Sequence, residues 1–112
     1  MKNKVQLIGH LGADLEVKTT ESGKKWARVS IATNESYQNA KGEKVTDTQW
    51  HNLVMWGKTA EIAGKYLHKG SDVGIEGKLI NRTYTDKSGT KKYVTEVEVQ
   101  ELLMLGKKES KA

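Results

Sequence analysis

Apolar and polar side chains alternate along most of this chain, which is the pattern of β-strands that bury one face. The alternation marks strands over residues 4–11, 25–37, 48–57, 72–84 and 93–105, with a short extended piece over 15–19. Turns and polar loops such as ESGK and QNAKGEK separate these segments. The pattern therefore predicts an all-β chain.

A single segment has helical spacing instead. Its apolar residues recur three and four positions apart: Ile62, Ala63, Tyr66 and Leu67. Thr59 is predicted to cap the start of this short helix, and Gly70 to mark its end. Gly64 inside the helix costs about 1 kcal/mol relative to alanine, so tertiary packing must hold the helix in place.

The order of elements is three strands, the helix and two more strands, which is the order of an OB-fold. We therefore predict a five-stranded OB-fold barrel with the helix between strands 3 and 4. Gly74 and Gly77 suit a strand that coils sharply to close such a barrel. Residues 1–105 are assigned to this domain, and residues 106–112 are predicted to form a short, basic, disordered tail.

Composition narrows the range of partners and locations. The 112 residues carry a formal net charge of +5, which favours a polyanionic partner, although many basic proteins bind none. The absence of cysteine excludes disulfides and thiolate metal sites. Neither a signal-peptide pattern nor an apolar run of membrane-spanning length occurs, so we expect a cytoplasmic protein with no membrane partner.

The most informative aromatic residues are Trp50 and Trp56, six positions apart in one predicted strand. Because side chains alternate along a strand, the two indoles share a face. Lysines and an arginine surround them, and flat π faces beside cations are what a single-stranded nucleic acid binds. A second interpretation stays open, in which both indoles belong to the core.

Basic residues close to the aromatic ones are candidate phosphate contacts. They are Arg28, Lys58, Lys78, Arg82, Lys87, Lys91 and Lys92. Arg82 is the strongest candidate, because it lies two residues before Tyr84 and points to the same side of the strand. Ordinary solvation is the alternative interpretation for each lysine.

The sequence favours a binding protein over an enzyme, with no metal and no cofactor. His10, His51 and His68 lie far apart and lack the spacing of metal ligands. Glu96 and Glu98 are interpreted as part of a solvated strand face rather than as a catalytic pair. Neither a phosphate-binding loop motif nor a hydrolase motif occurs.

Four segments carry a resemblance to a known family: VQLIGHLGADLEVKTTESGKKWARVSIATNESY, TDTQWHNLVMWGKTAEIAGKYLHKGSDVGIEGKL, NRTYTDKSG and YVTEVEV. Taken in order, over roughly residues 1–105, they resemble the bacterial single-stranded DNA-binding proteins (SSB). The resemblance implies an OB barrel and assembly as a homotetramer. It also implies sequence-nonspecific binding and protection of single-stranded DNA during replication, recombination and repair.

The resemblance further implies roles for individual residues. Bases would stack on four aromatic side chains: Tyr37, Trp50, Trp56 and Tyr84. Lys58, Lys69 and Arg82 would lie near the DNA path. His51 would lie near a subunit contact. Trp26 matches no stacking position of the family, so a core, interface or surface-patch role is favoured for it over DNA contact.

The C-terminus departs from the family pattern. SSB proteins typically end in a disordered tail with an acidic, hydrophobic tip that recruits replication and repair enzymes, whereas this chain ends in LGKKESKA. We expect either a naturally short member or a truncated chain, so recruitment through such a tip is not carried over.

Three other functions stay open. They are an RNA-binding OB-fold module, an accessory primosomal or phage-type OB protein, and an OB-fold phosphatase or nuclease. An open barrel would leave three apolar side chains exposed to solvent, those of Leu102, Leu103 and Met104. Their burial against another subunit is compatible with self-association, but it does not give the number of subunits.

Overall fold

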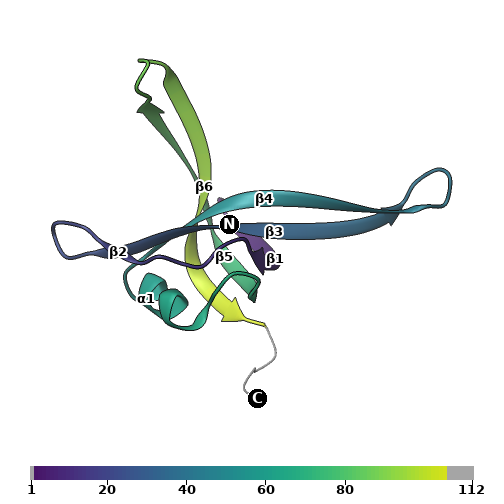
Figure 1. Ribbon diagram of the computed structural model, residues 1–112, viewed down its shortest axis with the longest axis horizontal. Helices are drawn as coiled ribbons and strands as arrows, with labels where there is room; N and C mark the ends of the chain where they lie inside the picture. The colour runs from purple at the N-terminus through teal and green to yellow at the C-terminus, as the bar shows by residue number, and fades with distance from the viewer. Residues whose placement is uncertain (1, 106–112) are drawn as a thin grey trace.

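The strands form one curled sheet that closes into a barrel. The computed structural model describes residues 2–105 (Figure 1). Its elements are β1 (Val5–Leu11), β2 (Lys18–Thr19), β3 (Lys25–Gln38), β4 (Lys44–Trp56), α1 (Gly57–Tyr66), β5 (Asp72–Thr85) and β6 (Lys91–Met104). The strand order is β1-β5-β6-β4-β3-β2, and β1 also pairs with β3 to close the barrel. All pairings are antiparallel except that of β4 with β6.

The predicted five-stranded OB-fold barrel is confirmed by this topology. The short extended piece forms the two-residue strand β2, so the helix lies between β4 and β5 in chain order. Counted among the five long strands, it follows the third, as predicted. The predicted tail over residues 106–112 lies outside the described residues.

Three hairpins extend away from the barrel body (Figure 1). They join β2 to β3, β3 to β4, and β5 to β6, and each pair of strands is antiparallel. The β3–β4 and β5–β6 hairpins are long, because β3, β5 and β6 each contain 14 residues and β4 contains 13. These hairpins carry side chains well beyond the core.

The helix begins earlier than predicted. Trp56, the last residue of β4, is also the N-cap residue of α1, and Gly57 follows it with a φ of 61°. A left-handed backbone is easily adopted only by glycine, so Gly57 turns the strand directly into the helix and Thr59 is not the cap. The helix also ends earlier, at Tyr66, while Gly70 lies in the turn that leads to β5.

The core lies inside the barrel under the helix. Ile31, Leu53 and Met55 are fully buried, and they belong to the inward-facing alternation of β3 and β4. Ala60 and Ala63 pack the helix onto this core. A Cβ atom at Gly64 would collide with the Val17 side chain, so glycine lets the helix approach the chain segment before β2. Within residues 2–105, no helix has the length and apolar character needed to cross a membrane.

A β-bulge divides the outer face of β5 and β6. The register shifts between Glu76 and Gly77, where Gly77 lies so close to the Glu98 carbonyl that a Cβ atom would collide with it. The prediction that Gly77 lets this strand coil to close the barrel is thus supported by the close approach of the β6 backbone. Gly74, in contrast, has ordinary space for a Cβ among the side chains of Ile8, Leu103 and Leu105.

We predict that Gly77→Ala lowers the free energy of unfolding by about 1–3 kcal/mol, because the added methyl group must push the β6 backbone away. Gly74→Ala on the same strand is the matched control and should change it by less than about 0.5 kcal/mol. Urea unfolding followed by circular dichroism measures both values. Equal effects of the two substitutions would contradict the close-approach explanation.

Candidate nucleic-acid interface

Trp50 and Trp56 lie on the outer face of β4. Their exposed fractions are 60% and 38%, whereas Leu53 and Met55 between them are fully buried. The interpretation of both indoles as core residues is therefore wrong, and the shared outer face is confirmed. Gly12 leaves room for the Trp50 ring, because a Cβ atom there would lie only 2.6 Å from it.

A third indole shares this face. Trp26 on β3 is the direct register partner of Trp56, and the two ring centroids are 6.3 Å apart with an angle of 36° between the ring planes. The Nζ atom of Lys18 lies 5.6 Å from the Trp26 centroid, and that of Lys24 lies 5.3 Å from the Trp56 centroid. Of the three roles predicted for Trp26, the structure favours the surface patch.

The Arg28 guanidinium lies over the Trp26 indole and donates a hydrogen bond to the buried carboxylate of Glu96. Its Cζ atom is 4.9 Å from the Trp26 centroid, and its Nε donates to Glu96 at 2.9 Å. Arg82 reaches the same carboxylate from β5, with its Nε and Nη2 donating at 3.1 and 3.3 Å. Glu96 thus joins the two arginines that the sequence predicted as phosphate contacts.

The interpretation of Glu96 as a solvated residue is wrong, since its side chain is only 4% exposed. Burial acts to raise the pKa of Glu96, but the hydrogen bonds from Arg82 and Arg28 outweigh it and leave this pKa below the ordinary value. The carboxylate in turn raises the pKa of Arg82. Sequence reasoning missed this group because strand alternation places Glu96 outward, and the two arginines that bond to it come from other strands.

The other two predicted stacking residues lie on the hairpins. Tyr84 is two residues beyond Arg82 on β5, in the same alternation, and is 51% exposed. Tyr37 is 55% exposed near the end of β3, but it alternates with the inward-facing residues of that strand rather than with Trp26. The structure therefore brings Trp50 and Trp56 together on the barrel and places Tyr84 and Tyr37 apart, each on its own hairpin.

The predicted lysines fall into separate groups. Lys78 lies on the same outer face and approaches Glu98 at 3.6 Å. Lys87 and Lys91 are exposed at the tip of the β5–β6 hairpin. Lys58 is the second residue of α1, and Lys69 lies three residues after the end of this helix. Lys78, Arg28 and Arg82 share the outer strand face with the three indoles. The two lysines beside the helix do not belong to that face.

His51 is half-buried beside this face. Its Nε2 atom lies 3.2 Å from the Thr33 hydroxyl, on the neighbouring strand. Among residues 2–105, no group of three or more His, Cys, Asp or Glu side chains is placed to hold a metal ion. The chemistry that the face offers is therefore π surface and fixed positive charge, which suits planar rings linked by anions.

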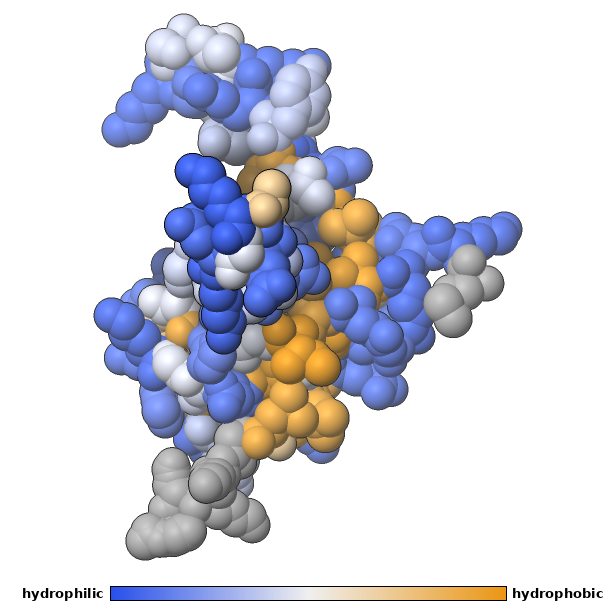
Figure 2. Space-filling model, turned by 90° about the vertical axis from the view of Figure 1, so that its right-hand side faces the viewer, coloured by the Kyte–Doolittle hydropathy of each residue, from blue (hydrophilic) through white to orange (hydrophobic). Residues whose placement is uncertain are grey.

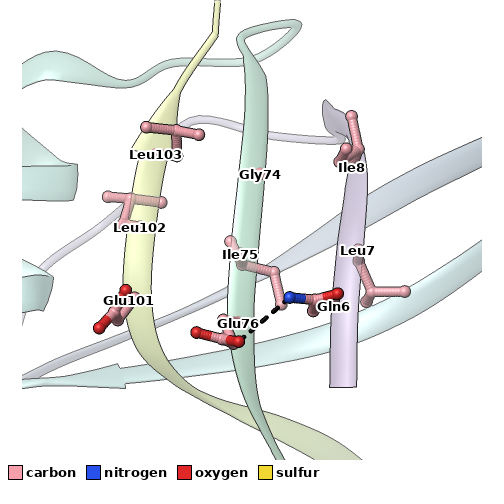
Figure 3. A pocket seen from close by; sticks show the side chains of 9 residues that line it. All are labelled: Gln6, Leu7, Ile8, Gly74, Ile75, Glu76, Glu101, Leu102 and Leu103. Carbon is pink, nitrogen blue, oxygen red and sulfur yellow. Dashed lines mark hydrogen bonds between the residues drawn. The ribbon is translucent and has the colours of Figure 1, made fainter. Parts of the chain in front are cut away.

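A second surface of a different kind lies below the bulge. Ile8 on β1 and Leu103 on β6 are 71% and 63% exposed, and together with Leu105 they surround Gly74. Figure 2 shows a continuous orange, hydrophobic area on the face turned toward the viewer. A hollow of about 340 Å³ lies among these strands, bordered by Gln6, Glu76 and Glu101 at one end (Figure 3).

Comparison with known proteins identifies the relatives of this chain. A family model described as the single-strand binding protein family matches residues 2–105. The chain is 44% identical over 108 residues to single-stranded DNA-binding protein 1 of Xylella fastidiosa, covering 96% of this chain and 79% of that protein. It is 46% identical over 109 residues to single-stranded DNA-binding protein 1 of Chlorobaculum tepidum, covering 96% and 67%. A solved structure, the Plasmodium falciparum SSB complex with ssDNA, matches with a TM-score of 0.84 at 30% identity, covering 95% and 96%.

We predict that Glu96→Gln lowers the free energy of unfolding at pH 7 by about 1–3 kcal/mol, because both guanidinium groups lose a charged acceptor. The folded-state pKa of Glu96 is lowered from 4.5, so its stabilisation is present above that pH and is lost as the pH falls through the folded value. The difference between the wild type and the variant should therefore shrink at pH 3.

Urea unfolding at pH 7 and pH 3 measures this change. Glu98→Gln is the matched control, since Glu98 is more exposed and pairs with Lys78 at 3.6 Å, and it should cost less than about 1 kcal/mol. A Glu96→Gln effect that stays constant between the two pH values would contradict the proposed ionisation.

Proposed function

Because this chain belongs to the single-strand binding protein family, we propose that it binds single-stranded DNA without strong sequence preference and protects it during replication, recombination and repair. The observation that carries this proposal is the exposed indole pair Trp50 and Trp56, on one face with the arginines joined by Glu96. Family membership also supports a binding protein rather than an enzyme. A cytoplasmic location stays a prediction.

Base stacking supplies the larger share of the binding energy in this proposal. Each stacked base contributes about 1–3 kcal/mol, and four aromatic sites, Tyr37, Trp50, Trp56 and Tyr84, are assigned to stacking. Every base presents a π face, so the contact does not depend on base identity. Duplex DNA hides these faces inside its own stack, so the same surface prefers a single strand.

The arginines supply oriented positive charge. A guanidinium group carries five N–H donors, and Glu96 accepts from one of Arg28 and two of Arg82. One carboxylate beside two guanidinium groups leaves an excess positive charge on the face, and the remaining donors are free to meet phosphates. The carboxylate thereby holds the two cations in place without neutralising both of them.

The lysines extend this charge along the proposed path. We assign phosphate contacts to Lys58, Lys69, Lys78, Lys87 and Lys91 in addition to the two arginines. The exposed positions of Lys87 and Lys91 on the β5–β6 hairpin support a path that continues past Tyr84. Each phosphate neutralised on a single strand contributes about −0.7 to the slope of log K against log salt.

Self-association as a homotetramer is part of the proposal. The exposed Ile8 and Leu103 form an apolar surface of the kind that a partner covers. The first five residues of β1 pair with β5 alone, which leaves one edge of that strand open for another strand. His51 is assigned to a subunit contact, and the number of four subunits rests on the family resemblance.

We predict that Trp50→Ala and Trp56→Ala each weaken binding to oligo(dT) by about fivefold to a hundredfold, with the salt slope nearly unchanged, because they remove stacking but no charge. Lys91→Ala is the contrasting variant and should reduce the magnitude of the slope by about 0.7. Fluorescence anisotropy of a labelled oligonucleotide at several salt concentrations measures both quantities.

Competition with tRNA in the same assay separates this function from RNA binding. Displacement of oligo(dT) by an equal mass of tRNA would favour an RNA-binding OB-fold module. Folded Trp50→Ala and Trp56→Ala variants that bind as tightly as the wild type would disprove the stacking role of these indoles.

We predict that Leu103→Glu lowers the mass measured by light scattering from four chains toward one, because a carboxylate cannot be buried in the apolar surface without a large cost. Ile62→Glu is the matched control, since Ile62 is a similarly branched, 40% exposed residue on α1. A tetramer that persists in folded Leu103→Glu would place the subunit contact elsewhere.

A further inference from the structure

We propose that Trp26 is a fifth stacking residue and that Trp26, Lys18 and Lys24 form an additional nucleotide subsite beside Trp56. One base of the bound strand would stack on Trp26, and the adjoining phosphates would meet the two lysines. The inference rests on the proposed function and deepens it, because it continues the DNA path past Trp56 onto the β2–β3 hairpin.

The strand register aligns the members of this subsite. Lys18 on β2 is the direct partner of Trp26 on β3, which is the direct partner of Trp56 on β4. Side chains that are directly opposite on paired strands project from the same face, so these three form one row across the sheet. The row continues the indole surface of Trp56 toward the edge of the sheet.

The two indoles form a continuous platform rather than a clamp. Their centroid separation of 6.3 Å is within the range of aromatic rings in mutual contact, so a base does not enter between them. Trp56 remains 38% exposed. Trp26 is half-buried, with Lys18 and Arg28 over its ring. A base arriving at Trp26 would displace the Lys18 side chain, while the Arg28 guanidinium stays bound to Glu96.

The charges around the platform indicate an anionic ligand. Lys18, Lys24 and Arg28 each lie within 5.6 Å of an indole centroid. Among the ion pairs of residues 2–105, Arg28 is paired with Glu96, while neither lysine has a carboxylate partner. Each ammonium group lies over a ring with no carboxylate to offset its charge, so a phosphate that binds beside the two rings is attracted by both lysines.

A variant that keeps only one indole tests the stacking directly. In Trp50→Tyr/Trp56→Tyr, the two new tyrosine rings can still stack on bases. Trp26 is then the remaining tryptophan of the chain. We expect oligo(dT) to quench its fluorescence in step with binding, which anisotropy of a labelled oligonucleotide follows independently. Bound oligonucleotide with unquenched Trp26 would overturn the inference and leave the proposed function intact, whereas absent binding by the wild type would overturn both.

Affinity measurements in the wild-type background provide the second arm. Trp26→Leu should weaken oligo(dT) binding by about fivefold to tenfold, and Lys18→Ala/Lys24→Ala should reduce the magnitude of the salt slope by about 1.4. The matched controls are Tyr66→Leu and Lys65→Ala, because this pair repeats the cation–π arrangement on α1, with Nζ 5.5 Å from the ring centroid. We expect both controls to bind as the wild type does.

Two results from these affinity measurements would overturn the inference. The first is unchanged affinity in Trp26→Leu, and the second is an unchanged salt slope in the double lysine variant. A loss of subunit assembly together with the first result would assign Trp26 to a subunit interface instead. Light scattering on the same samples measures the assembly.

Discussion

The register of β3 against β4 is the constraint on which the rest of the structure depends. It pairs Trp26 with Trp56 and Ala32 with Trp50, and it directs Leu53 and Met55 into the core. A slip of one residue would exchange the two faces of a strand, turning indoles inward and core residues outward. The same pairing that closes the barrel therefore also builds the aromatic face.

The outer face of the sheet is divided into two surfaces with different chemistry. Above the bulge at Gly77, the strands carry rings and cations, and Glu96 holds two guanidinium groups in position. Below it, Ile8 and Leu103 form an apolar surface around Gly74. Charged and apolar surfaces bind different partners, so the division lets one small barrel offer separate places for a polyanion and for another subunit.

Strand alternation made much of this structure predictable. It identified the five long strands and the common face of Trp50 and Trp56, and helical spacing identified the single helix, because these patterns depend on residues close together in sequence. The helix start was missed because a glycine at 57 with a φ of 61° turns the chain without a side-chain cap. Glu96 was missed because its partners include Arg28, which is 68 residues away in the chain.

The sequence by itself determined the barrel, the order of its elements along the chain and the kind of chemistry available, since hydrophobic periodicity and residue type are local properties. Only the tertiary structure decided which of the outward side chains act together. It joined Trp26 to the indole of Trp56 and placed one carboxylate between two arginines from different strands. The physical reason is that contacts across a sheet depend on register, and register is fixed by the packing of the whole core.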